Sequence, residues 1–374
     1  MNIAFYAPMK APDDPVISGD RETARLILAA LRAEGHEVTL VSRLRTWQKM
    51  PEEARFVALA DESAAETRRL LGDWTAGGAP DLWITYHLYH KAPDWLGPAV
   101  TAALGIPYVV LEGCRAAKHA SGAWATGFAQ ADRALLAADA VAALHEEDFE
   151  GLVPLVPGDR LFSLTPFVDA SRFESAAAQT RDTDPPVLAT VAMMRSGDKE
   201  ASYRLLADAL GRLGERPWRL IVAGDGPRRD AILALFPADR LDWRRALPPE
   251  AIPGVFADAD LFVWPAINEA FGVALLEAQA AGLPVVAGAS GGVPDIVRDR
   301  ETGLVVPEGD TDAFAAAVAR LLDDAEQRRA FGRVAAAYAR ARHDIPAGRA
   351  RLREILDHAI RTRALRRSVS AGAA

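Results

Sequence analysis

Short apolar runs alternate with helical stretches along most of the chain, and this alternation restricts the fold more than any other feature. The first half contains six such runs, NIAFYA, HEVTLV, DLWITY, PYVVLE, AVAAL and LFSLT. The second half contains five more, VLATVAM, RLIVAG, LFVWP, PVVAG and GLVVP. Strands that alternate with helices form parallel sheets with helices on both faces, so we expect an α/β protein.

The alternation is interrupted once, over residues 166–187, where Pro, Asp, Ser and Thr are frequent. A polar segment between two α/β patterns predicts an interdomain linker, and a length of 374 residues also favours two domains. We therefore predict a first domain over residues 1–167 and a second over residues 168–345. A last helix is expected over about residues 346–366, followed by a disordered tail at residues 367–374.

Charge and cysteine content exclude several kinds of protein. The formal net charge is −8, which gives no support for a nucleic-acid-binding protein. Cys114 is the only cysteine, so an internal disulfide and a cysteine-rich zinc site are excluded. No apolar run reaches the length of a membrane span, and the first residues do not form a signal peptide. We expect a cytoplasmic protein, and the basic segments 42–49 and 361–367 leave open a peripheral contact with the inner face of a membrane.

Two glutamates occur in an otherwise apolar segment, AINEAFGVALLEAQAAGLPVVAG. The run LFVWP ends a strand and GVALLEAQAAG begins a helix, so Glu269 lies in the turn and Glu277 about one and a half turns into the helix. The free N–H groups that follow Phe271 and Gly272 favour an anion such as phosphate, and nearby carboxylates accept hydrogen bonds from vicinal hydroxyls. The pattern indicates a sugar nucleotide. The alternative is that Glu269 only favours the helix dipole and Glu277 is a solvated helix residue.

This segment resembles the Glu-x7-Glu motif of retaining glycosyltransferases, in particular glycosyltransferase family 4, which has the GT-B fold. The segments LIVAGDGPRRDAI and PPEAIPGVFADADLFVWP before it, and ASGGVPDIVRDRETGLVVPEGDTDAFAAAVARLLDD after it, also resemble the family. The resemblance is strong over about residues 186–324 and weaker over the first half. It implies two Rossmann-like α/β/α domains whose parallel sheets face a central cleft, with the helix of residues 346–366 packed back on the first domain.

The resemblance also implies an activity. The enzyme would transfer a sugar, with retention of configuration, from a nucleoside-diphosphate sugar to an acceptor hydroxyl, without a metal or another cofactor. The second domain would bind the donor, and the first domain would bind an acceptor. The acceptor would be a glycan, a lipid or a small molecule, and the reaction would serve glycan, polysaccharide or glycolipid biosynthesis. A GT-B epimerase or phosphorylase, and a non-catalytic sugar-nucleotide-binding subunit, remain alternatives.

In the family, the first acid of the motif contacts the donor sugar and the second binds the ribose, which implies these roles for Glu269 and Glu277. The backbone N–H groups of Phe271, Gly272 and Val273 would then lie near the sugar and the diphosphate.

The segment VAMMRSGDKEASY resembles a strand end of the family that carries an arginine and a following lysine, here Arg195 and Lys199. Two fixed cations would stabilise the charge that grows on the leaving diphosphate. The alternative is that both are solvated loop residues. Asp258 and Asp260 resemble a manganese-binding pair of another fold, but they lie in a segment that this family shares, so no metal site is predicted.

The first domain departs from the family pattern. Where the family has a glycine-rich loop, this chain has only Gly19. One interpretation is that Gly19 contacts the donor, and the other is that this segment only caps a helix through Ser18 or Asp20. His87 aligns with a histidine often found at its strand end. Glu112 occupies a strand end where many family members carry a histidine, and its carboxylate would stabilise a cationic sugar or bind the acceptor hydroxyl. Cys114 is expected to be a packing residue.

Overall fold

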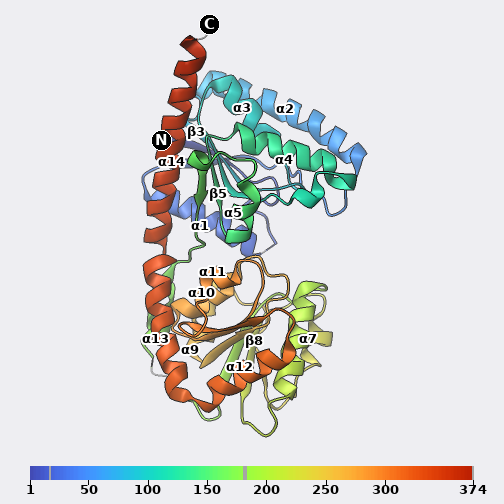
Figure 1. Cartoon of the computed structure of the whole chain (residues 1–374), viewed down its shortest axis with the longest axis vertical. Helices are drawn as coiled ribbons and strands as arrows, with labels where there is room; N and C mark the ends of the chain where they lie inside the picture. The colour runs from blue at the N-terminus through green and yellow to red at the C-terminus, as the bar shows by residue number, and fades with distance from the viewer. Residues whose placement is uncertain (17, 180–182, 373–374) are drawn as a thin grey trace. The chain divides into compact units, whose positions relative to one another are not determined.

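The computed structural model describes residues 1–16, 18–179 and 183–372 (Figure 1). It divides into two compact units. Unit 1 comprises Met1–Thr165 and Pro346–Ala374, and unit 2 comprises Pro166–Ile345. Each unit is built around its own parallel sheet with helices packed on it, as Figure 1 shows.

The sheet of unit 1 has six parallel strands in the order β2-β1-β3-β4-β5-β6. The strands are β1 (Asn2–Tyr6), β2 (Glu37–Ser42), β3 (Leu82–Leu88), β4 (Tyr108–Gly113), β5 (Ala140–Ala143) and β6 (Leu161–Ser163). The main helices are α1 (Gly19–Ala33), α2 (Glu53–Gly77), α3 (Leu96–Leu104), α4 (Ala125–Ala137), α5 (Glu146–Leu152) and α14 (Ile345–Gly372). The strand order reverses between β1 and β3, and in open α/β sheets ligands bind at the carboxyl ends of the strands beside such a reversal.

The sheet of unit 2 repeats this plan with the order β12-β11-β10-β7-β8-β9. The strands are β7 (Val187–Val191), β8 (Arg219–Ala223), β9 (Leu241–Trp243), β10 (Leu261–Trp264), β11 (Val285–Ala289) and β12 (Gly303–Pro307). The helices are α6 (Glu174–Ala177), α7 (Asp198–Gly211), α8 (Arg229–Leu233), α9 (Ile252–Ala257), α10 (Val273–Ala280), α11 (Val293–Ile296), α12 (Thr311–Asp323) and α13 (Ala325–Arg342). The central neighbours β7 and β10 pair directly, so the loops that follow them share one edge of the sheet.

The predicted α/β class is confirmed, and each predicted strand is present. Central strands such as β4 and β10 are buried along their whole length, which explains why their sequences are almost entirely apolar. The sequence did not predict β9, which has three half-buried residues, Leu241, Asp242 and Trp243. It also did not predict α2.

Two expectations about the connecting segments are wrong. The segment 166–187, predicted to be an interdomain linker, belongs to unit 2, and its Val168, Phe173 and Ala176 are buried in the core of that unit. The chain after residue 366 is helical rather than disordered as far as Gly372, while residues 373–374 lie outside the described residues. The C-terminal half of α14 contacts the rest of unit 1, since the Arg363 guanidinium donates to the Thr101 carbonyl oxygen at 2.6 Å.

Some of the basic side chains proposed for membrane contact bind within unit 1. The guanidinium of Arg45 lies 4.7 Å from the centre of the Trp47 ring, and that of Arg366 pairs with Asp139. In the described part of the chain, no helix combines the length and the apolarity needed to cross a bilayer.

Replacing Arg366 with Ala is expected to destabilise unit 1 by about 1–3 kcal/mol, because it leaves a buried carboxylate without its cation. The Asp139 side chain is 0% exposed and accepts from Arg366 Nη1 at 2.8 Å and from the Tyr108 backbone N–H at 3.0 Å. Thermal unfolding measures the effect. The matched control is Arg361→Ala, an exposed arginine on the same helix, and an equal change in Tm for both variants would contradict this role of the ion pair.

Candidate functional site

The carboxyl edge of the unit 2 sheet brings together two predicted site residues from different loops. Lys199 lies in the first turn of α7, which follows β7, and Glu269 lies in the loop that follows β10. The Lys199 ammonium forms an ion pair with Glu269 Oε2, and their side chains are 19% and 14% exposed. A partly buried pair of this kind is screened less by solvent than a surface ion pair.

Additional contacts fix the Glu269 carboxylate. The indole Nε1–H of Trp264, the last residue of β10, donates to Oε2 at 3.0 Å. The Glu269 backbone N–H donates to Ser290 Oγ at 3.1 Å. The Lys199 ammonium lies 5.4 Å from the centre of the Trp264 ring, which favours a cation at this place. The carboxylate and the ammonium are therefore positioned before any ligand binds.

The loop between β10 and α10 has a constrained backbone. Ala266 and Asn268 adopt left-handed φ angles of 58° and 46°, and Gly272 has a φ of 67° at the N-cap of α10. Side chains hold this loop, since the Asn268 N–H donates to Glu308 Oε1 at 2.8 Å and its side-chain amide donates to Asp198 Oδ2 at 3.1 Å. Non-glycine residues in this conformation cost energy and often occur at functional sites.

The other predicted donor-site residues lie around this loop. Gly272 caps α10 and Val273 begins it, which confirms the predicted strand–turn–helix arrangement. Glu277, on α10, and Phe271, before it, are both partly buried. Arg195 is exposed on the loop between β7 and α7, and no ion pair with Glu269 is present among the described residues. The structure therefore joins Lys199 to Glu269 but does not join Arg195 to them.

The carboxyl edge of the unit 1 sheet holds a second cluster. His87 near the end of β3 and Glu112 near the end of β4 adopt left-handed φ angles of 58° and 60°. His87 and Glu112 lie opposite each other on neighbouring strands. The residues before them, Tyr86 and Leu111, form one pair of the sheet, and the residues after them, Leu88 and Gly113, form the next. Two strained residues side by side direct an imidazole and a carboxylate toward one place.

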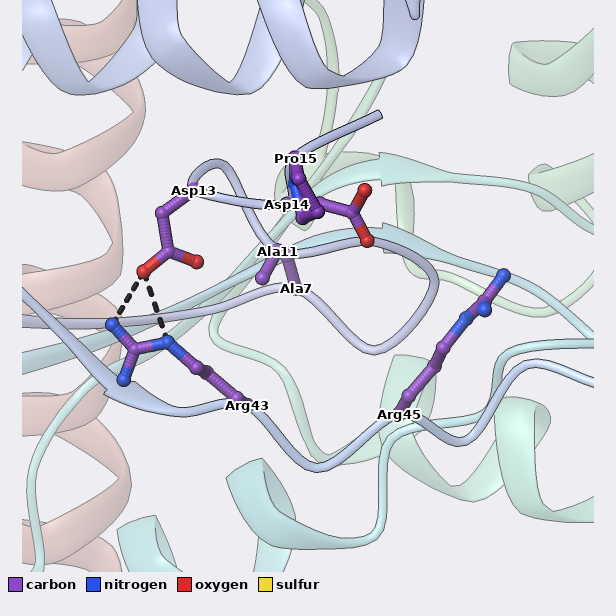
Figure 2. Close-up of a pocket in the computed structure, with 7 residues that line it drawn as sticks. All are labelled: Ala7, Ala11, Asp13, Asp14, Pro15, Arg43 and Arg45. Atoms are coloured by element: carbon purple, nitrogen blue, oxygen red, sulfur yellow. Dashed lines mark hydrogen bonds and ion pairs between the residues drawn. The ribbon is translucent and has the colours of Figure 1, made fainter. Parts of the chain in front are cut away.

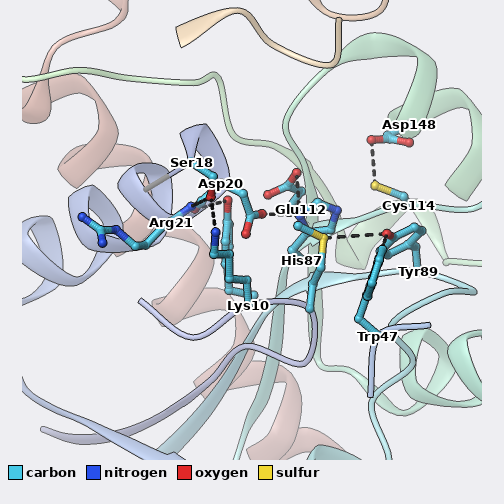
Figure 3. A network of polar contacts seen from close by, with 12 residues as sticks. Lys10, Ser18, Asp20, Arg21, Trp47, His87, Tyr89, Glu112, Cys114 and Asp148 are labelled. Carbon is cyan, nitrogen blue, oxygen red and sulfur yellow. Dashed lines mark hydrogen bonds and ion pairs between the residues drawn. The ribbon is translucent and has the colours of Figure 1, made fainter. Parts of the chain in front are cut away.

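Asp20 completes this cluster, as Figure 3 shows. His87 Nδ1 lies 2.5 Å from Asp20 Oδ1 and 3.3 Å from Glu112 Oε1. The N-cap of α1 is Ser18, whose hydroxyl accepts from the Arg21 N–H at 3.3 Å, so Asp20 is free to face His87 from the first turn of the helix. The sequence treated Asp20 only as a possible cap, although its position after the first strand places it at the same sheet edge.

Burial and mutual charge dominate the electrostatics of the cluster. Burial lowers the pKa of His87, but the carboxylates of Glu112 and Asp20 outweigh this and raise it to about 9. Burial also raises the pKa of the Glu112 carboxyl, against the opposing effect of His87. Burial, with the charges of Glu112 and Asp20, raises the pKa of the Tyr86 hydroxyl well above its usual value. The charge state of the imidazole therefore depends on the two carboxylates, and that of Glu112 depends in turn on the imidazole.

The remaining predicted residues of unit 1 have simpler surroundings. Gly19 is the first residue of α1, adjacent to Asp20. The Cys114 thiol donates to Asp148 Oδ2 at 2.9 Å, and burial raises its pKa well above the usual value (Figure 3). A thiol that is hard to ionise is a poor nucleophile, which agrees with a packing role.

A small open pocket of about 240 Å³ lies elsewhere in unit 1 (Figure 2). Arg43 pairs with Asp13 across it, and Arg45 donates from Nε to the Met9 carbonyl oxygen at 3.1 Å. Its lining residues are Ala7, Ala11, Asp13, Asp14, Pro15, Arg43 and Arg45. The pocket includes none of the predicted site residues.

Comparison with known proteins finds that part of the chain is similar to sugar-transferring enzymes. Residues 171–338 match the family described as glycosyl transferases group 1. The D-inositol 3-phosphate glycosyltransferase of Corynebacterium efficiens is 37% identical over 143 residues, which cover 36% of this chain and 34% of that protein. The GDP-mannose-dependent alpha-(1-6)-phosphatidylinositol monomannoside mannosyltransferase of Mycolicibacterium smegmatis is 33% identical over 196 residues, 47% of this chain and 50% of that protein. The matches thus span half or less of each relative, and they confirm the predicted resemblance to glycosyltransferases over this part of the chain.

Solved structures resemble the whole chain. Anabaena HepE in complex with UDP aligns with a TM-score of 0.73 and 17% identity, over 96% of this chain and 100% of that chain. Sucrose-phosphate synthase from Thermosynechococcus elongatus aligns with a TM-score of 0.71 and 19% identity, over 99% of each chain. At such identities the likeness establishes the fold alone, and the fold is the predicted two-domain α/β GT-B fold.

Proposed function

We propose that this protein is a retaining glycosyltransferase of family 4 that transfers a sugar from a nucleoside-diphosphate sugar to an acceptor hydroxyl. The observation that carries the proposal is the Lys199–Glu269 pair at the carboxyl edge of the unit 2 sheet, with Lys199 in the first turn of α7 and Glu269 in the loop preceding α10. This edge lies within the residues that match the glycosyltransferase family. Among the structural neighbours, HepE is described in complex with UDP and with UDP-glucose.

The residues of unit 2 suit the parts of such a donor. The Glu269 carboxylate accepts hydrogen bonds from hydroxyls of the sugar, and the Glu277 carboxylate accepts them from the ribose. The N–H groups at the start of α10, over residues 271–273, bind the diphosphate. Lys199 exchanges part of its contact with Glu269 for a phosphate oxygen, and the exposed Arg195 turns toward the same anion.

The transfer step follows from these roles. The bond between the anomeric carbon and the diphosphate oxygen breaks, and its electron pair leaves with the diphosphate. The acceptor oxygen forms the new bond on the same face, while its proton passes to a phosphate oxygen. Lys199 and Arg195 stabilise the charge on the leaving group, so this step needs no metal ion at the diphosphate.

We assign acceptor binding to unit 1, where His87 and Glu112 lie near the carboxyl edge of the sheet. The acceptor is a glycan, a lipid-linked sugar or a small metabolite, and we place the reaction in the cytoplasm, with peripheral contact to the membrane for a lipid acceptor.

A thermal-shift screen of the purified chain against UDP-, GDP- and ADP-sugars tests the proposal. A ligand that binds only the folded protein raises Tm, so the cognate donor is expected to do so while the other nucleotides do not. Release of nucleoside diphosphate on addition of acceptor, with a product of unchanged anomeric configuration by NMR, then identifies the transferase. Binding without turnover would indicate a non-catalytic subunit, and an altered free sugar nucleotide an epimerase. No shift with millimolar concentrations of any of them would refute donor binding.

A further inference from the structure

We propose that Asp20, His87 and Glu112 form a binding site for a divalent transition-metal cation such as Mn²⁺, Co²⁺ or Zn²⁺. The three side chains converge from the first turn of α1 and the ends of β3 and β4 (Figure 3). The sugar-transfer step proposed for unit 2 does not use such a cation.

The three donor atoms lie close enough together to reach a single ion. One atom from each side chain lies within 4.8 Å of the other two. His87 Nδ1 is 2.5 Å from Asp20 Oδ1 and 3.3 Å from Glu112 Oε1. Metal bonds to imidazole nitrogen and carboxylate oxygen are about 2.0–2.2 Å long, so two atoms bound at right angles to one ion lie about 3 Å apart. The His87–Asp20 distance is shorter than this and the His87–Glu112 distance slightly longer, so binding an ion requires His87 and Asp20 to move apart.

Unsatisfied oxygens provide a second, independent indication of a ligand. Glu112 Oε2 and Asp20 Oδ2 are buried and have no hydrogen-bond partner among the described residues. The Glu112 side chain is only 2% exposed, so water screens its charge poorly. A buried carboxylate oxygen is costly unless a donor or a cation compensates it, and a metal ion bound by these two carboxylates would compensate their charge.

The positive groups around the cluster are directed elsewhere. The Lys10 ammonium donates to Ser18 Oγ at 3.0 Å and lies 3.8 Å from Asp14. Arg21 pairs with Glu22 at 2.8 Å. The Tyr86 hydroxyl, beside the cluster, donates to the Asp20 carbonyl oxygen over a long 3.4 Å. In the described part of the chain, His87 is thus the one basic side chain that pairs with both carboxylates.

The ligand set also selects a class of metal. One imidazole and two carboxylates suit Mn²⁺, Co²⁺ and Zn²⁺, whereas Ca²⁺ and Mg²⁺ prefer oxygen ligands alone and Cu⁺ prefers sulfur. Three protein ligands leave coordination positions open to water or to a hydroxyl-bearing molecule. The competing explanation for the short distances is a proton on His87 shared between the two carboxylates.

Metal binding to the full chain distinguishes these explanations. Protein treated with EDTA and dialysed is titrated with MnCl₂, CoCl₂ or ZnCl₂, and bound metal is measured by equilibrium dialysis alongside Tm. We expect one saturable site per chain and a rise in Tm with at least one cation. For Co²⁺, visible absorption bands would report coordination directly.

Three variants locate the site. Glu112→Gln and His87→Gln are expected to weaken the binding at least tenfold, while Glu22→Gln, also in the first turn of α1, leaves it unchanged. Two variants on different strands keep the test valid if one fails to fold, which circular dichroism monitors. Absence of a saturable site, or binding that neither variant weakens, overturns the proposal. Since no sugar nucleotide is present, failure here is separate from failure of the donor-binding proposal.

Discussion

The variant Lys199→Met is expected to lower the turnover of sugar transfer by about 10²–10³-fold, the loss typical for one preorganised charge-stabilising group. The methionine keeps most of the length and the apolar stem of the side chain but removes its charged end. Lys199 is fixed by Glu269 and lies over the Trp264 ring, so its charge is in place before the diphosphate begins to leave. The negative charge on the leaving group grows only in the transition state, so kcat should fall far more than KM rises.

Release of nucleoside diphosphate at saturating donor concentration measures this effect. Arg333→Met, at an exposed arginine on α13 of the same unit, is the control and is expected to retain full turnover. Comparison of Tm with the wild type shows whether the Lys199 variant is folded. A kcat within threefold of the wild type would remove Lys199 from the proposed mechanism.

The positions of most site residues in the fold could be predicted, because they depend only on the strand that each residue ends or follows. A residue at the end of an apolar strand, or in the segment that follows it, lies near the carboxyl edge of a parallel sheet, whatever the order of the strands. This reasoning placed Lys199, Glu269, His87 and Glu112 at sheet edges, and the structure agrees. The resemblance to glycosyltransferases then indicated which residues at these sheet edges are candidates for the functional site.

The partners of these residues could not be predicted, since they depend on strand order. Asp20 and His87 are 67 residues apart, and they meet because β1 lies beside β3 rather than at an edge of the sheet. Lys199 and Glu269 are 70 residues apart and meet because β7 pairs with β10. No periodicity in the sequence encodes that pairing, so the sequence indicated Asp20 only as a helix cap.

Short or mixed segments failed for a different reason. The strand β9 is three half-buried residues long, too short for a pattern of alternation to appear. The segment 166–187 contains enough polar residues to predict a linker, yet its scattered apolar side chains pack into the core of unit 2. The composition of a segment describes its average polarity, whereas its packing depends on the few apolar side chains that it contains.

Replacing Glu277 with Ala is expected to weaken binding of the nucleoside-diphosphate sugar by about 10–150-fold. This range corresponds to the 1.5–3 kcal/mol typical of a hydrogen bond to a charged group. Glu277 lies partly buried on α10, the helix whose N-terminus we assign to the diphosphate. The free nucleoside diphosphate carries the same ribose, so its affinity should fall by the same factor. An effect on the sugar nucleotide alone would instead place Glu277 at the sugar.

Isothermal titration of the wild type and the variant, with both ligands, separates these outcomes. The matched control is Glu326→Ala, an exposed glutamate of the same unit on α13, which should leave both affinities unchanged. The variant also separates binding from chemistry, because the ribose is remote from the bond that breaks. With saturating donor, Glu277→Ala should recover most of the wild-type turnover, whereas Lys199→Met should not. If both variants lost turnover equally at saturation, the division between a ribose-binding and a charge-stabilising role would be wrong.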